Sequence, residues 1–165
     1  EPTLNPAFPE IIDITIELRD KYFPKALVSV LTNATRIGRP DVFKALRKVD
    51  NPILKLDAPT DELAVRINQP QGEYHVADVV ESMRKFEGDF VMQTMFLRSK
   101  DFDSSSPEVL KGWLEIVKDL RPREVMVYTL DREAPAAGLE KLTVGEMESL
   151  TGPLVEAGIK VQIRG

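Results

Sequence analysis

Segments with helical periodicity alternate with short β-rich segments along almost the whole chain, and this alternation limits the folds that the chain can adopt. The pattern predicts helices over 8–22, 42–49, 76–86, 107–117 and 144–157, and strands over 25–31, 53–56, 90–97, 124–129 and 159–163. Thr143 and Glu146 have the spacing of a capping box before the last helix, and Pro153 leaves open whether that helix is continuous. Repeated strand–helix units require parallel strands joined by right-handed crossovers, so the sequence predicts an α/β fold.

The composition excludes several kinds of site. At 165 residues, 42% of them hydrophobic, the chain is long enough for one domain, which we expect to span residues 1–165. A net charge of −5 argues mildly against broad nucleic-acid binding. The chain has no cysteine and one histidine, so we predict no thiolate or His-based metal site and no cysteine nucleophile in it. Without a long apolar run or a signal segment, the expected location is the cytoplasm.

One face of the expected sheet carries polar side chains, although a parallel sheet covered on both faces should be almost continuously apolar. Strand alternation places Ser29 with Asn33, and Lys55 with Asp57, while Gln93 lies on the corresponding face of its own strand. Such a face suits a partly open barrel that holds a polar ligand, because a buried, unpaired lysine is costly. The alternative is that these side chains lie at strand ends or pair with one another.

The first residues, Glu1-Pro2-Thr3-Leu4, have the character of a loop, with no initiator methionine and no preceding strand. In α/β folds the loops that follow strand carboxyl ends carry the chemistry. We therefore expect that a strand before residue 1 is missing, together with part of a reactive centre. Its loss would leave the sheet edge beside residues 25–31 open. We expect this edge to pair with another copy of the chain as a homodimer, to be covered by a loop, or to aggregate.

Short motifs then follow in a consistent order. Leu31-Thr32-Asn33-Ala34 ends the first expected strand, Leu56-Asp57-Ala58 ends the second, and Ile67-Asn68-Gln69-Pro70 follows it. With Glu1-Pro2 at the start and Tyr128-Thr129-Leu130-Asp131-Arg132 late in the chain, this order resembles the radical S-adenosylmethionine (radical SAM) enzymes. The resemblance is to the Fe–S oxidoreductase branch that includes the tRNA-wybutosine-synthesising enzymes, and it covers essentially the whole chain. That family has Gly-Gly-Glu-Pro, Thr-Asn-Gly, Ser-Leu-Asp-Ala and Ile-Asn-Arg-Pro, so Lys55 replaces a serine and Gln69 an arginine.

The resemblance implies a partial TIM-like (βα)6 barrel truncated at its N-terminus. In the family, a Cys-x3-Cys-x2-Cys loop after the first strand binds a [4Fe–4S] cluster that reduces S-adenosylmethionine and releases a 5′-deoxyadenosyl radical. That loop is absent from this chain. The resemblance therefore implies an oxidoreductase of unknown substrate as the intact protein, and an inactive chain by itself.

Site residues follow from the same resemblance, position by position. Glu1 would accept hydrogen bonds from the methionine ammonium of S-adenosylmethionine, with Thr32 and Asn33 near its methionyl or ribose part. Asp57 would contact ribose hydroxyls or the substrate, and Lys55 the methionine carboxylate or a substrate acid. Structural interpretations remain open beside these: Glu1 as a disordered terminus, Thr32-Asn33 as turn residues, and Asp57 as the cap of the next helical turn.

Gln93 and Tyr128 are the candidates for substrate contacts. Two other functions also stay open. Lys55 at a strand end suits an aldolase-like TIM-barrel enzyme that forms a Schiff base with a carbonyl substrate. Alternatively, the same scaffold could be a non-catalytic module that binds a protein or a nucleotide. The wybutosine branch implies tRNA binding, for which the acidic balance gives no independent support.

Overall fold

A computed structural model describes residues 1–130 and 138–165. Its centre is a five-stranded parallel sheet in the order β1-β2-β3-β5-β7. These strands are β1 (Ser29–Thr32), β2 (Asn51–Lys55), β3 (Val91–Met95), β5 (Glu124–Tyr128) and β7 (Val161–Arg164). Neighbouring strands are all in parallel register, so their carboxyl ends meet at one edge, as the alternation predicts.

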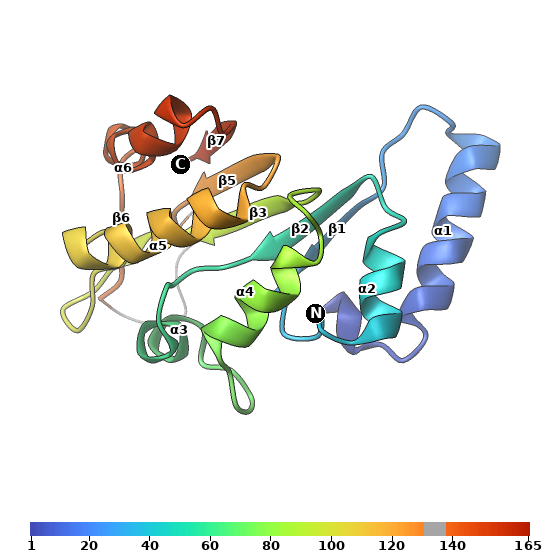
Figure 1. The fold of residues 1–165 in the computed structure, drawn as a ribbon, viewed down its shortest axis with the longest axis horizontal. Helices are drawn as coiled ribbons and strands as arrows, with labels where there is room; N and C mark the ends of the chain where they lie inside the picture. The colour runs from blue at the N-terminus through green and yellow to red at the C-terminus, as the bar shows by residue number, and fades with distance from the viewer. Residues whose placement is uncertain (131–137) are drawn as a thin grey trace.

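Helices join the strands, and Figure 1 shows them ranged along the sheet from α1 at one end to α6 at the other. They are the 3-10 helix η1 (Pro2–Leu4) and the α-helices α1 (Phe8–Tyr22), α2 (Pro40–Leu46), α3 (Asp61–Asn68), α4 (Val76–Arg84), α5 (Pro107–Leu120) and α6 (Val144–Glu156). The sequence interpretation missed α3, which lies within the connection expected over 57–73. It also began the first strand too early, since residues 25–28 precede β1.

The helices cover only one face of the sheet. Alternate strand residues form one continuous hydrophobic core with the helices; its strand members include Val30, Leu54, Met92, Val125 and Val127. On the opposite face Leu31 is exposed and Ile53 and Met126 are half-buried, and all three lie outside that core. The predicted polar face is therefore the uncovered face, as in a partly open barrel.

Local sequence signals explain where several elements begin and end. Thr60 caps α3 by accepting a hydrogen bond from the Leu63 backbone. Thr143 and Glu146 form the expected capping box at the start of α6. That helix is continuous through Pro153. Helix α4 ends at Arg84. Beyond it, the φ of +80° at Gly88 allows a tight passage into β3, where an added Cβ would lie 2.7 Å from a backbone oxygen of the loop after α5.

A second, two-stranded antiparallel sheet joins β4 (Leu97–Arg98) to β6 (Glu140–Lys141) beyond the carboxyl end of β3. Arg98 ties this sheet to α6 through an ion pair of 2.7 Å with Glu146. Strands of two residues have no detectable pattern of their own, and the sequence interpretation did not include them. Within the described ranges, none of the helices combines the length and the apolar character that crossing a membrane requires.

Candidate functional site

The first group of predicted site residues is built around the Glu1 carboxylate. Its Oε1 accepts hydrogen bonds from the backbone N and the hydroxyl of Thr3, at 3.1 and 2.5 Å, and from the Thr32 hydroxyl at 2.7 Å. Its Oε2 accepts one from the Asn33 backbone N at 2.6 Å. Burial alone would raise the pKa of Glu1, but these hydrogen bonds together hold it below its ordinary value. The structure thus brings Glu1, Thr32 and Asn33 together at the carboxyl end of β1.

The turn after β1 depends on a left-handed residue. Ala34 is buried and has a φ of +64°, a conformation that favours glycine. Asn33 Oδ1 accepts hydrogen bonds from the backbone N and the hydroxyl of Thr35, at 3.1 and 2.8 Å, and closes the turn. The family pattern has glycine at the position of Ala34, so the backbone here agrees with the resemblance. Asn33 therefore serves the turn and the Glu1 carboxylate together.

The second group is an ion pair at the end of β2. Lys55 Nζ lies 2.9 Å from Asp57 Oδ2 and donates a hydrogen bond to Asn68 Oδ1 at 3.2 Å. The Asp57 side chain is fully buried, and its Oδ1 accepts a hydrogen bond from the Met95 backbone N at 2.9 Å. The Lys55 ammonium is the close polar neighbour of Asp57 Oδ2, which makes no further hydrogen bond among the described residues.

Burial and the Asp57 charge shift the pKa values around this pair. Burial would lower the pKa of Lys55, but the Asp57 carboxylate outweighs it and raises that pKa above its ordinary value. Burial, with the nearby charges of Asp57 and Asp61, raises the pKa of Tyr74 to about 12. Burial likewise raises the pKa of Tyr128. Because a Schiff-base lysine attacks as a neutral amine, the raised pKa of Lys55 gives the aldolase-like interpretation no support.

A buried hydrogen-bond relay fixes the strand ends below the ion pair. The Thr94 hydroxyl donates to the Leu56 carbonyl at 2.8 Å and accepts from Trp113 Nε1 at 3.1 Å. Trp113 packs edge-on against Phe96 with ring centroids 5.1 Å apart. Because Leu56 immediately precedes Asp57, these hydrogen bonds from Trp113 on α5 help to fix the position of the buried Asp57 carboxylate.

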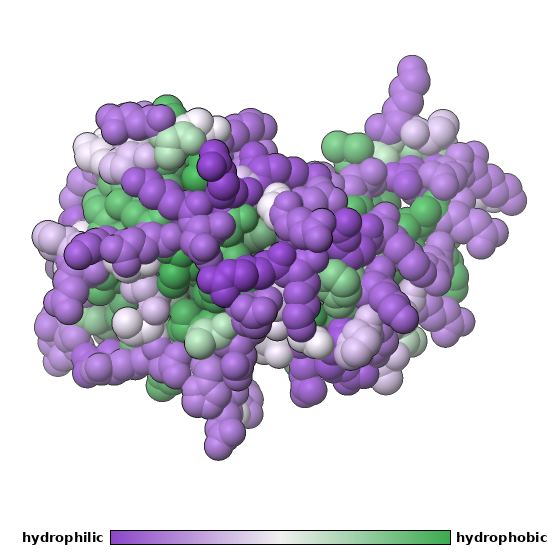
Figure 2. Space-filling view, in the orientation of Figure 1, coloured by the Kyte–Doolittle hydropathy of each residue, from purple (hydrophilic) through white to green (hydrophobic). Residues whose placement is uncertain are grey.

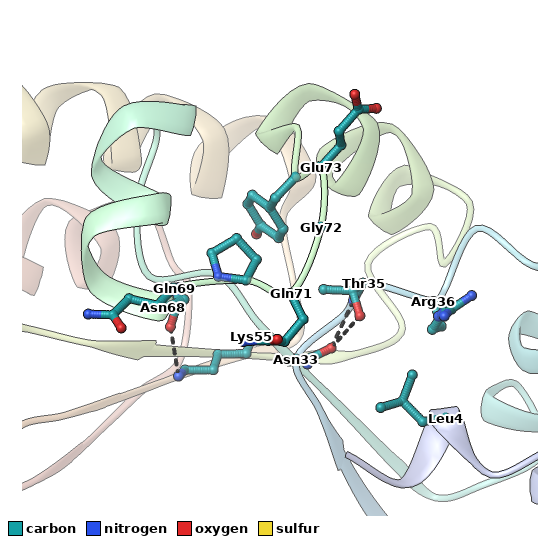
Figure 3. Close-up of a pocket in the computed structure, with 12 residues that line it drawn as sticks. Leu4, Asn33, Thr35, Arg36, Lys55, Asn68, Gln69, Gln71, Gly72 and Glu73 are labelled. Carbon is teal, nitrogen blue, oxygen red and sulfur yellow. Dashed lines mark hydrogen bonds between the residues drawn. The ribbon is translucent and has the colours of Figure 1, made fainter. Parts of the chain in front are cut away.

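A cavity of about 610 Å³ opens between these two groups. Its lining comes from the turn after β1, the end of β2 and the connection between α3 and α4, and comprises Leu4, Asn33, Thr35, Arg36, Lys55, Asn68, Gln69, Pro70, Gln71, Gly72, Glu73 and Tyr74. In Figure 3 Lys55 points to Asn68 on one side, and Asn33 and Thr35 lie on the other. The sequence interpretation did not name Asn68 or Tyr74 as site residues; the spacing of Leu63 and Ile67 after Thr60 is the signal that could have revealed α3.

Two further cavities lie nearby. Gln93 and Tyr128, the predicted substrate-side residues, line the second one together with Arg164, with a volume of about 390 Å³. The third, of about 540 Å³, lies beside α3 and β4 and includes Met95. Gln69 borders both the first cavity and the third. Gln93 and Tyr128 are thus brought together, in a cavity distinct from the one that Asn33 and Lys55 line.

The described residues form no cluster that could bind a metal ion or the [4Fe–4S] cluster of the radical SAM enzymes. None of their histidine, aspartate and glutamate side chains gather in groups of three or more that could hold a metal ion. The chain has no cysteine, so its residues do not fit a thiolate-bound [4Fe–4S] cluster. Asp131 and Arg132 of the late motif lie outside the described residues.

Comparison of sequences identifies two distant relatives. The chain is 28% identical over 139 residues to UPF0026 protein slr1464 from Synechocystis, covering 82% of this chain and 49% of the relative. It is 26% identical over 133 residues to UPF0026 protein MJ1312 from Methanocaldococcus jannaschii, covering 78% of this chain and 39% of the relative. The chain therefore spans about half or less of the length of these curated relatives. No protein-family model matches it.

Solved structures share its fold at low sequence identity. A domain of pyruvate-formate lyase-activating enzyme from Bacteroides vulgatus matches 100% of this chain and 94% of its own, at a TM-score of 0.71 and 15% identity. Streptococcus suis SuiB bound to S-adenosylmethionine matches 100% of this chain and 38% of its own, at 0.73 and 12%. A radical SAM methyltransferase from Sphaerobacter thermophilus matches 82% of this chain and 39% of its own, at 0.66 and 18%. The predicted fold class, an α/β partial TIM-like barrel, is thereby confirmed, and these structures share that fold.

Proposed function

We propose that this chain is the S-adenosylmethionine-binding part of a radical SAM enzyme. The observation that carries the proposal is the cavity at the carboxyl edge of the parallel sheet, which Asn33 and Lys55 both line. The Glu1 carboxylate is bound to the Asn33 backbone on one side, and the Lys55 ammonium lies on the other, held by the buried Asp57 carboxylate at 2.9 Å. A carboxylate and an ammonium on opposite sides of a cavity complement the ammonium and the carboxylate of an amino-acid group such as the methionine part of S-adenosylmethionine.

The Glu1 carboxylate can accept a further hydrogen bond, from the ammonium group of the same ligand. A carboxylate offers about four lone-pair sites. Three donors crowd Oε1, whereas Oε2 accepts only the Asn33 backbone N, which leaves room on Oε2 for the methionine ammonium. In this arrangement the buried Thr32 hydroxyl acts by orienting Glu1 and does not itself touch the ligand.

Lys55 supplies a cation at the wall of the first cavity. Its ammonium pairs with Asp57 at 2.9 Å and donates a hydrogen bond to the uncharged Asn68 amide, and its side chain stays 24% exposed. A ligand carboxylate from S-adenosylmethionine or a substrate acid would complete its coordination. Gln93 and Tyr128 then remain for the substrate in the second cavity.

Reductive cleavage of S-adenosylmethionine needs a [4Fe–4S] cluster, for which this chain supplies no ligand. We therefore assign to the chain itself binding and orientation, and the oxidoreductase activity to a longer protein that also carries the cluster. The name of the two UPF0026 relatives states no reaction, so the wybutosine branch and a cytoplasmic location remain predictions, and we assign no substrate.

Equilibrium dialysis of the 165-residue chain against radiolabelled S-adenosylmethionine tests the proposal. Asp57→Asn should weaken binding by about tenfold or more, since it removes the charge that holds the Lys55 ammonium at the cavity wall. Asp41→Asn is the matched control, because it changes an exposed carboxylate that pairs with Arg39. The proposal would be contradicted if binding of S-adenosylmethionine to the unaltered chain does not saturate. It would also be contradicted if the Asp57→Asn chain, shown by circular dichroism to be folded, binds S-adenosylmethionine as tightly as the unaltered chain does.

The parent activity has its own test. A full reading frame that includes this chain, purified anaerobically and reconstituted with iron and sulfide, should release 5′-deoxyadenosine from S-adenosylmethionine in a dithionite-dependent reaction. Glu1→Gln should suppress that release. If the reconstituted protein releases no 5′-deoxyadenosine, the proposed radical SAM activity is refuted. The binding of S-adenosylmethionine to the 165-residue chain is tested separately by the dialysis measurement.

A further inference from the structure

The third cavity differs from the first in the chemistry of its walls. Its volume of about 540 Å³ is typical of small-molecule sites, which are mostly apolar with a few polar groups. Six of the ten residues that line it, all from the interior of the chain, are hydrophobic: Val65, Ile67, Met95, Leu97, Phe102 and Leu139. In Figure 2 hydrophobic residues reach the surface on the side of the molecule where Figure 1 places α3 and α5. The third cavity therefore suits an apolar group, whereas amide and charged side chains make up much of the first.

Hydrogen bonds around the loop after β4 hold the apolar wall in place. The Ser99 backbone N donates to the Phe102 carbonyl at 2.8 Å, and Ser99 Oγ accepts from the Phe102 backbone N at 3.2 Å. The buried Ser104 hydroxyl accepts from the Leu97 backbone N and donates to the Leu97 carbonyl, both at 2.8 Å. These contacts within the chain fix the positions from which Leu97 and Phe102 line the cavity.

The charges that line the cavity disfavour an anionic ligand. Arg66 is the cation among the described lining residues, and its guanidinium is already engaged. Its Nη2 pairs with Glu62 at 2.8 Å, and its Nη1 donates to the Asp101 carbonyl at 3.0 Å. The Asp101 side chain adds a carboxylate to the same lining. An anionic group would therefore meet a carboxylate without a free positive charge to offset it.

Met95 places this cavity beside the residues assigned above. Its backbone N donates to Asp57 Oδ1 at 2.9 Å, so the carboxylate that holds Lys55 also fixes the end of β3. Met95 is in register with Tyr128 on β5, and residues in register direct their side chains to the same face of a sheet. Met95 lines the third cavity and Tyr128 the second. The two cavities therefore adjoin at this pair of residues.

We propose that the third cavity binds the apolar part of the substrate, whose polar part lies beside Tyr128 in the second cavity. The substrate is then an amphipathic small molecule with an aromatic or branched aliphatic end that carries no negative charge. Its assignment as the substrate rests on the proposed function, whereas the binding of an apolar group in the third cavity does not.

The methionines make a direct test available, because they lie in different surroundings. Met83, Met92 and Met147 are buried in the core, Met95 lines the third cavity and Met126 the second. Nuclear magnetic resonance of the chain with 13C-methyl-labelled methionine therefore reports on each cavity separately. Titration with the neutral probe 2-naphthalenemethanol should shift the Met95 methyl resonance saturably and leave the three core resonances in place. The matched anion 2-naphthoate should bind at least about tenfold more weakly, because of Asp101.

Val65→Asp should weaken binding of 2-naphthalenemethanol by about tenfold or more, because it places a charge in the apolar wall. The Val65 side chain is 47% exposed, so the change leaves the core intact. Val155→Asp is the matched control, because Val155 on α6 is 60% exposed and lies outside all three cavities. It should leave the affinity unchanged.

The proposal would be overturned by a Met95 resonance that does not shift saturably, or by a probe that shifts Met126 alone. It would also be overturned if Val65→Asp and Val155→Asp weakened binding equally, or if 2-naphthoate bound as tightly as the neutral probe. The two proposals are tested with different ligands. Binding of S-adenosylmethionine without a Met95 shift by the naphthalene probe would refute this inference alone, and the converse result would refute the proposed function alone.

Discussion

Thr94→Val tests whether the buried relay beneath the ion pair stabilises the fold. Valine has nearly the shape of threonine, so the change opens no cavity, but it removes the hydroxyl that donates to the Leu56 carbonyl and accepts from Trp113 Nε1. Each buried group left without a partner costs about 1–3 kcal/mol, and the added methyl recovers part of this, so we expect a loss of about 2–4 kcal/mol in the free energy of unfolding.

Urea unfolding followed by far-ultraviolet circular dichroism measures this loss. Thr94→Ser is the control: it keeps the hydroxyl and removes only a methyl group, at about 1 kcal/mol. A double-mutant cycle of Thr94→Val with Trp113→Phe should give a coupling energy of about 1 kcal/mol, since the second change removes the donor itself. If Thr94→Val is as stable as Thr94→Ser at an unchanged denaturant slope, the relay contributes nothing and the reasoning is refuted.

Two further predictions concern the segments that flank the first cavity. The pKa of His75 should lie above its ordinary value of 6.5, chiefly because of its hydrogen bond to Asp61 at 2.9 Å, and Asp61→Asn should return it toward 6.5 in a proton NMR titration of the single histidine. Because the pKa of His75 is higher in the folded chain than in the unfolded chain, the pair with Asp61 stabilises the fold fully below pH 6.5. This stabilisation is lost as the pH rises through the pKa of the folded chain. A His75 titration at the ordinary pKa in the unaltered chain would show that the pair with Asp61 does not form. At Ala34, glycine should change the free energy of unfolding by less than about 1 kcal/mol, because relief of the left-handed backbone offsets the lost methyl and the freer unfolded chain, whereas Ala34→Val should cost more than about 2 kcal/mol. Thermal unfolding distinguishes these, and equal stability of the two variants would disprove the conformational argument.

The parts of the fold that could be predicted are those with a local cause. Thr143 and Glu146 specify a capping box through spacing alone, and the strands of the main sheet follow from apolar segments between helical ones. The polar face was visible because Lys55 and Gln93 interrupt strands that would otherwise be apolar. Helix α3 was missed because it is only eight residues long and lies between Thr60 and Pro70, where the sequence interpretation placed a connection, and β4 and β6 because tertiary pairing alone defines them.

The candidate site divides in the same way. Pleating placed Lys55 near Asp57, and the structure gives them a direct contact. The link from Glu1 to Thr32 joins residues 31 positions apart, and only the resemblance to a known family indicated it. Asn68 reaches Lys55 because α3 exists, so no reasoning that lacked that helix could assign it.

Gln69 ends α3 in a left-handed conformation, with a φ of 43°, and it lines both the first and the third cavity. A displacement of Gln69 would therefore change the walls of both cavities at once. A molecule bound on one side of α3 that moved this residue would alter the space on the other side, and the left-handed end of α3 would link the occupancy of the two cavities.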